Sequence, residues 1–182
     1  AEQIAGRQQS IWEGADFLFM AMDTLITEEE KVYKRLGGMF AHSSPLLLIG
    51  SGTTHSTAIQ ADYVIGEMGK VFTKSLTAGE FRHGPIESVS PEYVTILFDG
   101  DEDFYEDITT LAEFLSRQGI PCLWLTNRSD ISITPKGIHV ESFPFCNKYL
   151  FPFVATIYAE IIGYHLCLNR NEQPGVLQYV RK

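Results

Sequence analysis

Residues 46–87, LLLIGSGTTHSTAIQADYVIGEMGKVFTKSLTAGEFRHGPIE, decide how this chain folds. With Pro45 they open as PLLLIG, a short continuous apolar run that ends in glycine and is typical of a strand buried on both faces. The pattern over residues 54–68 predicts a helix, and KVFTKSL at residues 70–76 predicts a second strand. The stretch therefore predicts a strand–helix–strand unit, in which a right-handed crossover joins two parallel strands.

The chain beyond this unit continues to alternate strands with helices. We expect further strands at residues 94–98, 122–126 and 137–141, and helices from residue 101 to about 118 and from about 148 to 168. This alternation predicts an α/β fold, a three-layer α/β/α domain built on a five-stranded parallel sheet. In such a sheet, ligands bind beyond the carboxyl ends of the strands, at the point where the strand order reverses.

The N-terminal 42 residues have a helical pattern, in which apolar residues recur at spacings of three, four and seven. Thr27 precedes three glutamates, which predicts the N-cap and first turn of a second helix, and Gly37-Gly38 ends that helix. The arm is too apolar to stand alone, so we expect it to pack on the domain or on another chain. The predicted organisation is a helical arm over residues 1–42 and an α/β domain over residues 43–182.

Composition and charge narrow the classes of partner. The 182 residues carry a net charge of −9, so a duplex nucleic-acid partner, which requires a basic face, is not expected. Cys122, Cys146 and Cys167 lack metal-type spacing, which favours free thiols in a reducing cytoplasm. Polar residues such as Glu160 interrupt the apolar run over residues 149–168, which favours a buried core helix over a membrane span. We therefore predict a cytoplasmic protein without membrane contact.

The turn Gly50-Ser51-Gly52 precedes Thr53 and Thr54 at the start of a predicted helix. Glycine lets the backbone approach a ligand closely, and the N–H groups of a helix N-terminus carry a partial positive charge that suits phosphate. The segment has no P-loop lysine and does not complete G-x-G-x-x-G, so nucleotide binding is not predicted. The alternative is an ordinary strand-to-helix turn with a threonine cap.

Two residues are candidate proton carriers. Glu67 falls at the C-terminal end of the same helix among apolar residues and glycines, a setting in which a carboxylate can act as a general base. His83 follows Glu80 and Arg82 on an expected loop, and histidine suits proton transfer because it titrates near neutral pH. The alternatives are a solvated carboxylate at a helix end and a surface or capping histidine.

The order of these motifs, GSG, then a glutamate, then GEFRHGPIE, resembles the sugar isomerase (SIS) family. In detail it is similar to the second SIS module of fructosamine 6-phosphate deglycases, such as the fructoselysine 6-phosphate enzyme. It is more distantly similar to the isomerase half of glucosamine 6-phosphate synthase. The resemblance covers residues 45–182 and implies a flavodoxin-like α/β/α fold. The catalytic glutamate of the family sits 16 positions before the histidine of HGP, and these positions are Glu67 and His83 here.

The resemblance also implies roles for these residues. Glu67 would move protons between C1 and C2 of an open-chain sugar. His83 would assist ring opening or proton delivery, within its own subunit or from a neighbouring one. No cluster of His, Cys, Asp or Glu residues has metal-ligand spacing, so neither a metal nor another cofactor is expected. The expected substrate-binding residues are Gly50, Ser51, Gly52, Thr53, Thr54, Glu80, Arg82 and Tyr179.

Three departures from the family refine the predicted function. The glutamate and lysine that precede the catalytic glutamate in the synthase are Gln60 and Val64 here, which argues against glucosamine 6-phosphate synthesis. The synthase lysine that forms a Schiff base corresponds to Tyr179, which suits a deglycase because its substrate already carries an amine. The phosphate loop of the first module, Ser-x-Ser-Gly-[Glu/Gln]-Thr, is absent. The chain is therefore either the C-terminal piece of a two-module enzyme or dependent on a partner for its phosphate site.

We therefore predict the phosphosugar-binding module of a fructosamine 6-phosphate deglycase. The reaction would shift the carbonyl from C2 to C1 and then hydrolyse the glucosylamine to glucose 6-phosphate and an amine. The alternatives are an aldose–ketose or amino-sugar phosphate isomerase or deaminase, and a non-catalytic sugar-phosphate-binding or dimerisation module. The expected partners are a phosphorylated sugar or sugar-amine and a second SIS module, which is either another copy in a homodimer or a first module.

Overall fold

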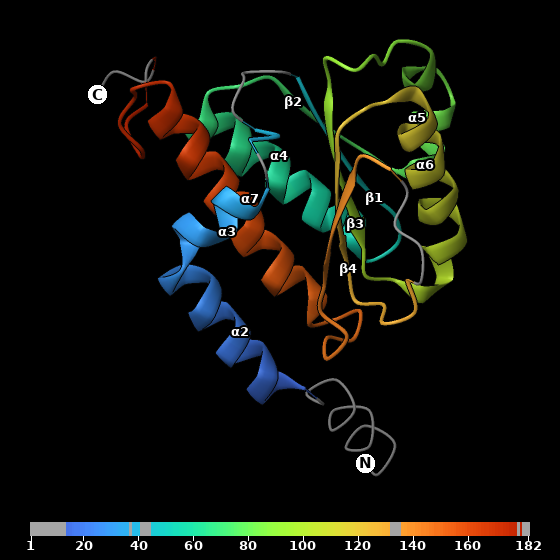
Figure 1. Cartoon of the computed structure of the whole chain (residues 1–182), viewed down its shortest axis with the longest axis horizontal. Helices are drawn as coiled ribbons and strands as arrows, with labels where there is room; N and C mark the ends of the chain where they lie inside the picture. Colours follow the sequence, from blue (N-terminus) through green and yellow to red (C-terminus); the bar gives the residue numbers. More distant parts are fainter. Residues whose placement is uncertain (1–13, 37, 41–44, 132–135, 178, 180–182) are drawn as a thin grey trace.

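A five-stranded parallel sheet forms the centre of the computed structural model, which describes residues 14–36, 38–40, 45–131, 136–177 and 179 (Figure 1). The strands are β1 (Leu46–Gly50), β2 (Thr73–Leu76), β3 (Val94–Asp99), β4 (Cys122–Thr126) and β5 (Ile138–Ser142). They lie in the order β2-β1-β3-β4-β5, and every neighbouring pair is parallel. The predicted α/β fold is confirmed, and the strand order reverses between β1 and β3.

Helices cover both faces of the sheet. They are α2 (Ala15–Thr27), α3 (Glu29–Arg35), α4 (Thr54–Gly69), α5 (Ala78–Arg82), α6 (Tyr105–Gln118) and α7 (Phe151–Asn169), with short 3-10 turns at Pro85–Glu87 and Glu102–Phe104. α4 and α7 pack side by side on one face, and α2 and α3 pack on α7 (Figure 1). α5 and α6 cover the opposite face with a second hydrophobic cluster. The predicted three layers are therefore present.

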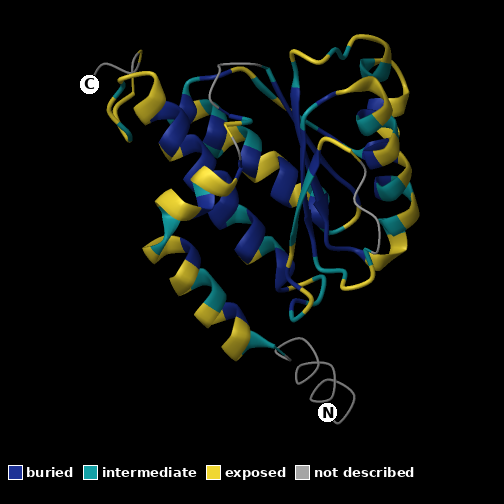
Figure 2. Ribbon diagram, viewed as in Figure 1, coloured by how far each residue is buried: buried dark blue, intermediate teal, exposed yellow. Residues whose placement is uncertain are grey.

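The side chains of β1 alternate between the two hydrophobic clusters. Leu46 and Leu48 belong to the cluster beneath α4 and α7, whereas Leu47 and Ile49 belong to the cluster beneath α5 and α6. Every residue of β1, β3 and β4 is buried, whereas the edge strands β2 and β5 are partly exposed (Figure 2). The continuous apolar runs of the sequence thus mark the strands that are covered on both faces.

α7 is the apolar helix expected near the C-terminus. By length and composition it could cross a membrane, but 61% of its 18-residue apolar window is buried inside the protein. Gly69 lets α4 approach α7 closely, because a Cβ at this position would lie 3.1 Å from the Cβ atom of Leu166. The prediction of a buried core helix is therefore confirmed.

The N-terminal arm packs on the domain, but one detail of its prediction is wrong. α2 continues through Thr27, whose hydroxyl donates to the carbonyl oxygen of Asp23 at 2.8 Å. Thr27 is therefore not the N-cap of α3, because its hydroxyl bonds back into its own helix. Leu25 of α2 and Val32 of α3 join the cluster around α7. The helical pattern before residue 14 lies outside the described residues, and the division of the chain into an arm and a domain stays a prediction.

Two local predictions around β2 also differ from the structure. The strand expected from residue 70 begins only at Thr73, because Lys70 adopts a left-handed conformation with φ +54° and ends α4. The expected loop that follows β2 contains the short helix α5. A capping box stabilises the start of α5. The Thr77 hydroxyl accepts a hydrogen bond from the Glu80 N–H, and the Glu80 carboxylate accepts one from the Thr77 N–H.

Candidate functional site

The Gly50-Ser51-Gly52 turn lies at the carboxyl end of β1, where the strand order reverses. The structure uses the hydroxyls of Ser51 and Thr54 internally, whereas the buried Thr53 hydroxyl has no hydrogen-bond partner among the described residues. The Ser51 hydroxyl oxygen accepts from the Ala78 N–H at 3.2 Å, and the Thr54 hydroxyl donates to the Phe98 carbonyl oxygen at 2.9 Å. Both side chains are buried, so they join the turn to α5 and β3.

The N-terminus of α4 already holds a negative charge. Asp101 Oδ2 accepts a hydrogen bond from the Thr53 N–H at 2.9 Å, and the Lys148 ammonium lies 3.4 Å from Asp101 Oδ1. Burial disfavours the charged carboxylate, but the hydrogen bonds and Lys148 outweigh burial and lower the pKa of Asp101. Gly52 has φ +59°, and a Cβ there would lie 2.4 Å from Asp101 Oδ2. A phosphate at this turn would therefore have to displace a carboxylate.

His83 follows α5 and is exposed. Its neighbours in the GEFRHGP segment are held within the protein. Hydrogen bonds from Thr77 lower the pKa of the Glu80 carboxyl, and the Arg82 guanidinium lies 2.7 Å from an Asp107 carboxylate oxygen. Across the described part of the chain, no hydrogen bond or ion pair involves the His83 side chain. Of the three polar residues, His83 is thus the one available to an external group.

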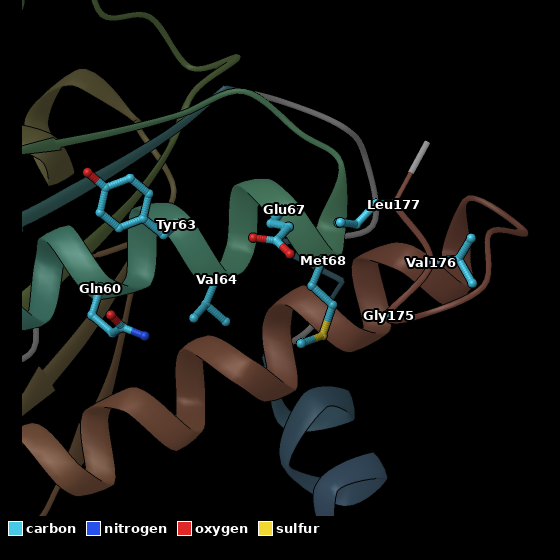
Figure 3. Close-up of a pocket in the computed structure, with 8 residues that line it drawn as sticks. All are labelled: Gln60, Tyr63, Val64, Glu67, Met68, Gly175, Val176 and Leu177. Carbon is cyan, nitrogen blue, oxygen red and sulfur yellow. The ribbon is translucent and has the colours of Figure 1, made fainter. Parts of the chain in front are cut away.

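Glu67 lies near the C-terminal end of α4, at the wall of a cavity of about 240 Å³ (Figure 3). We call it the α4–tail cavity, because α4 forms one wall and the segment after α7 forms the other. Its lining residues are Gln60, Tyr63, Val64, Glu67, Met68, Gly175, Val176 and Leu177. The positions that depart from the synthase, Gln60 and Val64, thus share a helix face with Glu67.

A second cavity, of about 530 Å³, shares Glu67 and Leu177 with the first. We call it the basic cavity, because Lys70 and Arg170 contribute to its lining. The full lining is Gly66, Glu67, Lys70, Val71, Phe72, Arg170, Leu177 and Tyr179. Tyr179 is 92% exposed. The structure therefore brings two of the predicted site residues, Glu67 and Tyr179, to one place.

Glu67 and His83 lie on opposite faces of the sheet. α4 packs in the cluster with α7, whereas α5 packs through Phe81 in the cluster with α6 (Figure 1). Glu67 is also at the end of α4 that leads into β2, whereas α5 follows the carboxyl end of β2. One chain therefore does not bring the two candidate proton carriers together, because the sheet lies between them.

Several lining residues were not predicted from the sequence. Tyr63 and Met68 could have been found, because Tyr63 lies four positions before Glu67 in α4 and Met68 lies four positions after Val64. Lys70 and Arg170 carried no such signal. They are far apart in the chain and meet only because α4 packs on α7.

The described residues contain no group of three or more His, Cys, Asp or Glu side chains that could hold a metal ion. Cys122, Cys146 and Cys167 are free and buried, which confirms the prediction of unpaired thiols. Burial raises the pKa of the Cys122 thiol and raises that of Cys146 to about 11. The Cys122 and Cys146 thiols are therefore protonated packing groups and not nucleophiles.

Comparison with known proteins shows the family. Residues 39–169 match the SIS domain. The chain is 25% identical over 171 residues to glutamine–fructose-6-phosphate aminotransferase [isomerizing] of Acinetobacter baylyi, covering 93% of this chain and 27% of that protein.

Solved structures show the same fold. The C-terminal domain of glucosamine-fructose-6-phosphate aminotransferase from Francisella tularensis superimposes with a TM-score of 0.79 at 16% identity, covering 97% of this chain and 48% of the other. Tagatose-6-phosphate ketose/aldose isomerase from Escherichia coli gives 0.72 at 18% identity, covering 93% and 47%. This chain thus spans about a quarter of the curated relative and about half of these solved chains. It belongs to the SIS domain family, as its motifs suggested.

Proposed function

We propose that this chain is the proton-transferring SIS module of a fructosamine 6-phosphate deglycase and that Glu67 is its general base. The observation that carries the proposal is the position of Glu67 on the wall shared by two cavities. A carboxylate on a helix that packs against the core is held in a fixed place, and a small ligand in either cavity can reach it.

In the proposed reaction, the Glu67 carboxylate removes a proton from C1 of the open-chain substrate. The C1–H electrons form a C1–C2 double bond, and the C2 carbonyl oxygen takes up a proton from solvent water and becomes a hydroxyl; the later hydrolysis of the C1–N double bond returns a proton to solvent. The protonated Glu67 then returns its proton to C2, which leaves a C1–N double bond. Water adds to C1, the C1–N bond breaks, and the products are glucose 6-phosphate and the free amine. General acid–base catalysis of this kind requires one carboxylate within reach of both carbon atoms.

The residues around Glu67 suit a substrate that carries its own amine. Tyr179 stands where the synthase has its Schiff-base lysine, which suits a substrate whose nitrogen is already bonded to C1. Gln60 and Tyr63 supply an amide and a hydroxyl that can bond to sugar hydroxyl groups.

His83 would act in a site that a second module completes. Within one chain the sheet separates it from Glu67, so an exposed His83 can approach only the Glu67 of another module. The two solved chains compared above are about twice as long as this one, which supports pairing of two modules. We propose that the partner is a second copy or a first SIS module.

A ketose–aldose isomerase is the second candidate. The similarity to tagatose-6-phosphate ketose/aldose isomerase favours it. The same Glu67 would shift the same proton between C1 and C2, but no amine would be released.

Substitution of the base tests both candidates. We expect Glu67→Gln to slow the release of free lysine from fructoselysine 6-phosphate by about 10²- to 10⁴-fold, because glutamine cannot accept the C1 proton. Deuterium incorporation at C1 and C2 in D₂O should fall in parallel. Glu92→Gln removes an exposed carboxylate outside the site and is the matched control.

Each outcome assigns a different function. Unchanged turnover in Glu67→Gln would exclude Glu67 as the base. Ketose–aldose exchange by the wild type without lysine release would identify an isomerase. Binding of sugar phosphates by the wild type without either reaction would identify a non-catalytic module.

A further inference from the structure

The carboxylate of Asp62 joins the helix that carries Glu67 to the strand that follows it. Asp62 lies on α4 and is half-buried. Its Oδ1 atom accepts a hydrogen bond from the Thr73 hydroxyl at 2.5 Å, and its Oδ2 atom accepts one from the Ser75 N–H at 2.8 Å. Both partners belong to β2. We call these two hydrogen bonds the Asp62 tie, because they fasten α4 to β2.

The Asp62 tie satisfies a polar group at the edge of the sheet. β2 is the outermost strand beside β1, and the backbone of an edge strand presents N–H groups that no neighbouring strand accepts. The Ser75 N–H bonds to the Asp62 carboxylate at this edge. A hydrogen bond to an ionised acceptor is stronger than one between neutral groups. The contact between α4 and β2 is therefore directional as well as close.

The Asp62 tie acts on the part of α4 that carries Glu67. Gly66 follows Asp62 by one helical turn, and a Cβ at Gly66 would lie 2.9 Å from the Thr73 hydroxyl oxygen. The same part of the helix packs on α7 through apolar residues such as Ile65. Packed helices can slide past one another by small distances, whereas hydrogen bonds depend on direction. The tie therefore fixes where the last turns of α4, and with them Glu67, lie along the helix axis.

We infer that Asp62 is a positioning residue that holds the Glu67 carboxylate in place for proton transfer. The inference rests on the proposed function, in which one base serves both C1 and C2 of the substrate. Asp62 does not line the α4–tail cavity or the basic cavity, so it acts through the helix and not on the substrate. Displacement of a catalytic group by about 1 Å can slow a reaction by about 10²-fold.

A purely structural role for Asp62 would give a different result. In that role the carboxylate would only stabilise the edge of the sheet. Its removal would then lower the melting temperature, but each molecule that remained folded would react at the wild-type rate. Rates expressed per folded molecule therefore separate positioning from stability.

The test measures lysine release from fructoselysine 6-phosphate and deuterium incorporation in D₂O, with the folded fraction taken from circular dichroism. We expect Asp62→Ala to lower kcat about 10- to 100-fold and to change KM by less than about threefold, because the substrate still binds while the base is displaced. Asp62→Asn keeps an acceptor oxygen for the Ser75 N–H and should restore most of the rate.

Ser116→Ala is the matched control. It removes a hydrogen bond from α6 to a loop, in which the Ser116 hydroxyl donates to the Lys136 carbonyl oxygen at 2.7 Å. α6 covers the face of the sheet opposite α4, so this loss does not act on Glu67. The control should therefore keep the wild-type kcat per folded molecule.

Thr73→Val provides a second approach to the same contact, because it removes the hydroxyl that bonds to Asp62. We expect a smaller decrease in kcat than in Asp62→Ala. The double variant should be no slower than Asp62→Ala alone, because both changes break one contact and their effects are not additive. If Asp62→Ala does not fold, Thr73→Val alone decides: a lowered kcat at constant KM supports the inference, and a wild-type kcat contradicts it.

The remaining outcomes are distinguishable. A wild-type kcat per folded molecule in Asp62→Ala, or an equal decrease in Ser116→Ala, would overturn the inference. A raised KM at constant kcat would also overturn it, because the tie would then shape the cavities and not position the base. These results leave the proposed function standing. If the wild type neither incorporates deuterium nor releases lysine, the proposed function itself fails.

Discussion

Asp99 is a buried acid whose surroundings raise its pKa. It ends β3 and is 1% exposed. Its Oδ2 atom accepts from Trp124 Nε1 at 2.9 Å and from the Thr126 hydroxyl at 3.0 Å, while Oδ1 accepts no hydrogen bond from any described residue. Burial raises the pKa of Asp99 to about 6, although these hydrogen bonds and the Arg128 charge act in the opposite direction.

The raised pKa predicts a pH-dependent contribution to stability. Because the unfolded chain releases this proton at lower pH than the folded chain, the stability from protonated Asp99 is present below about pH 4 and lost as pH rises through 6. Between these values the wild type should lose roughly 2–3 kcal/mol relative to Asp99→Asn, whose side chain stays neutral. Urea unfolding from pH 4 to 7 measures this difference. The exposed Asp23→Asn is the control, and parallel curves for the wild type and Asp99→Asn would contradict the prediction.

The glycine turn at the β1–α4 junction lets the end of β1 lie close to the first residue of α4. A Cβ at Gly50 would lie 2.4 Å from the Thr54 carbonyl oxygen, so the close backbone approach here is made by the protein itself. We expect Gly50→Ala to lower the free energy of unfolding by about 1–3 kcal/mol, because the helix start would have to shift. Gly79→Ala in α5 is the matched control, since its Cβ would meet only Thr77 Oγ1 at 3.8 Å. Urea unfolding measures the stability of both variants. Equal free energies of unfolding would show that the turn accommodates the added Cβ without cost, and the prediction would then be wrong.

In the whole molecule, Glu67 and His83 lie on opposite faces of the sheet. A subunit-mixing experiment therefore tests whether His83 acts on the Glu67 of another copy. If two copies pair so that each supplies His83 to the other, Glu67→Gln and His83→Gln are inactive alone. When mixed and reassembled they should recover about a quarter of wild-type turnover, because half the dimers are hybrids with one intact site of two. Recovery is measured as lysine release after refolding the mixture. No recovery in a verified dimer would show that His83 does not act across such an interface.

Much of the fold could be read from the sequence, and the reasons are local. The runs LLLIG and CLWLT place apolar side chains on both sides of the backbone. A strand with this pattern is buried only when helices cover both faces of its sheet. The start and end of α4 likewise follow from its own residues, and so does the position of Glu67 near its end. α5 was missed, although the Thr77-x-x-Glu80 capping box was readable in the sequence.

The sequence by itself determined the parallel sheet, the membership of the family and the two residue types suited to proton transfer. Each of these depends on periodicity or motif order within a short window. Only the tertiary structure decided that Asp101 occupies the N-terminus of α4, that the sheet separates Glu67 from His83, and that Lys70 and Arg170 meet beside Glu67. These facts depend on which segments pack together, and a contact between segments far apart in the chain leaves no pattern in either segment alone.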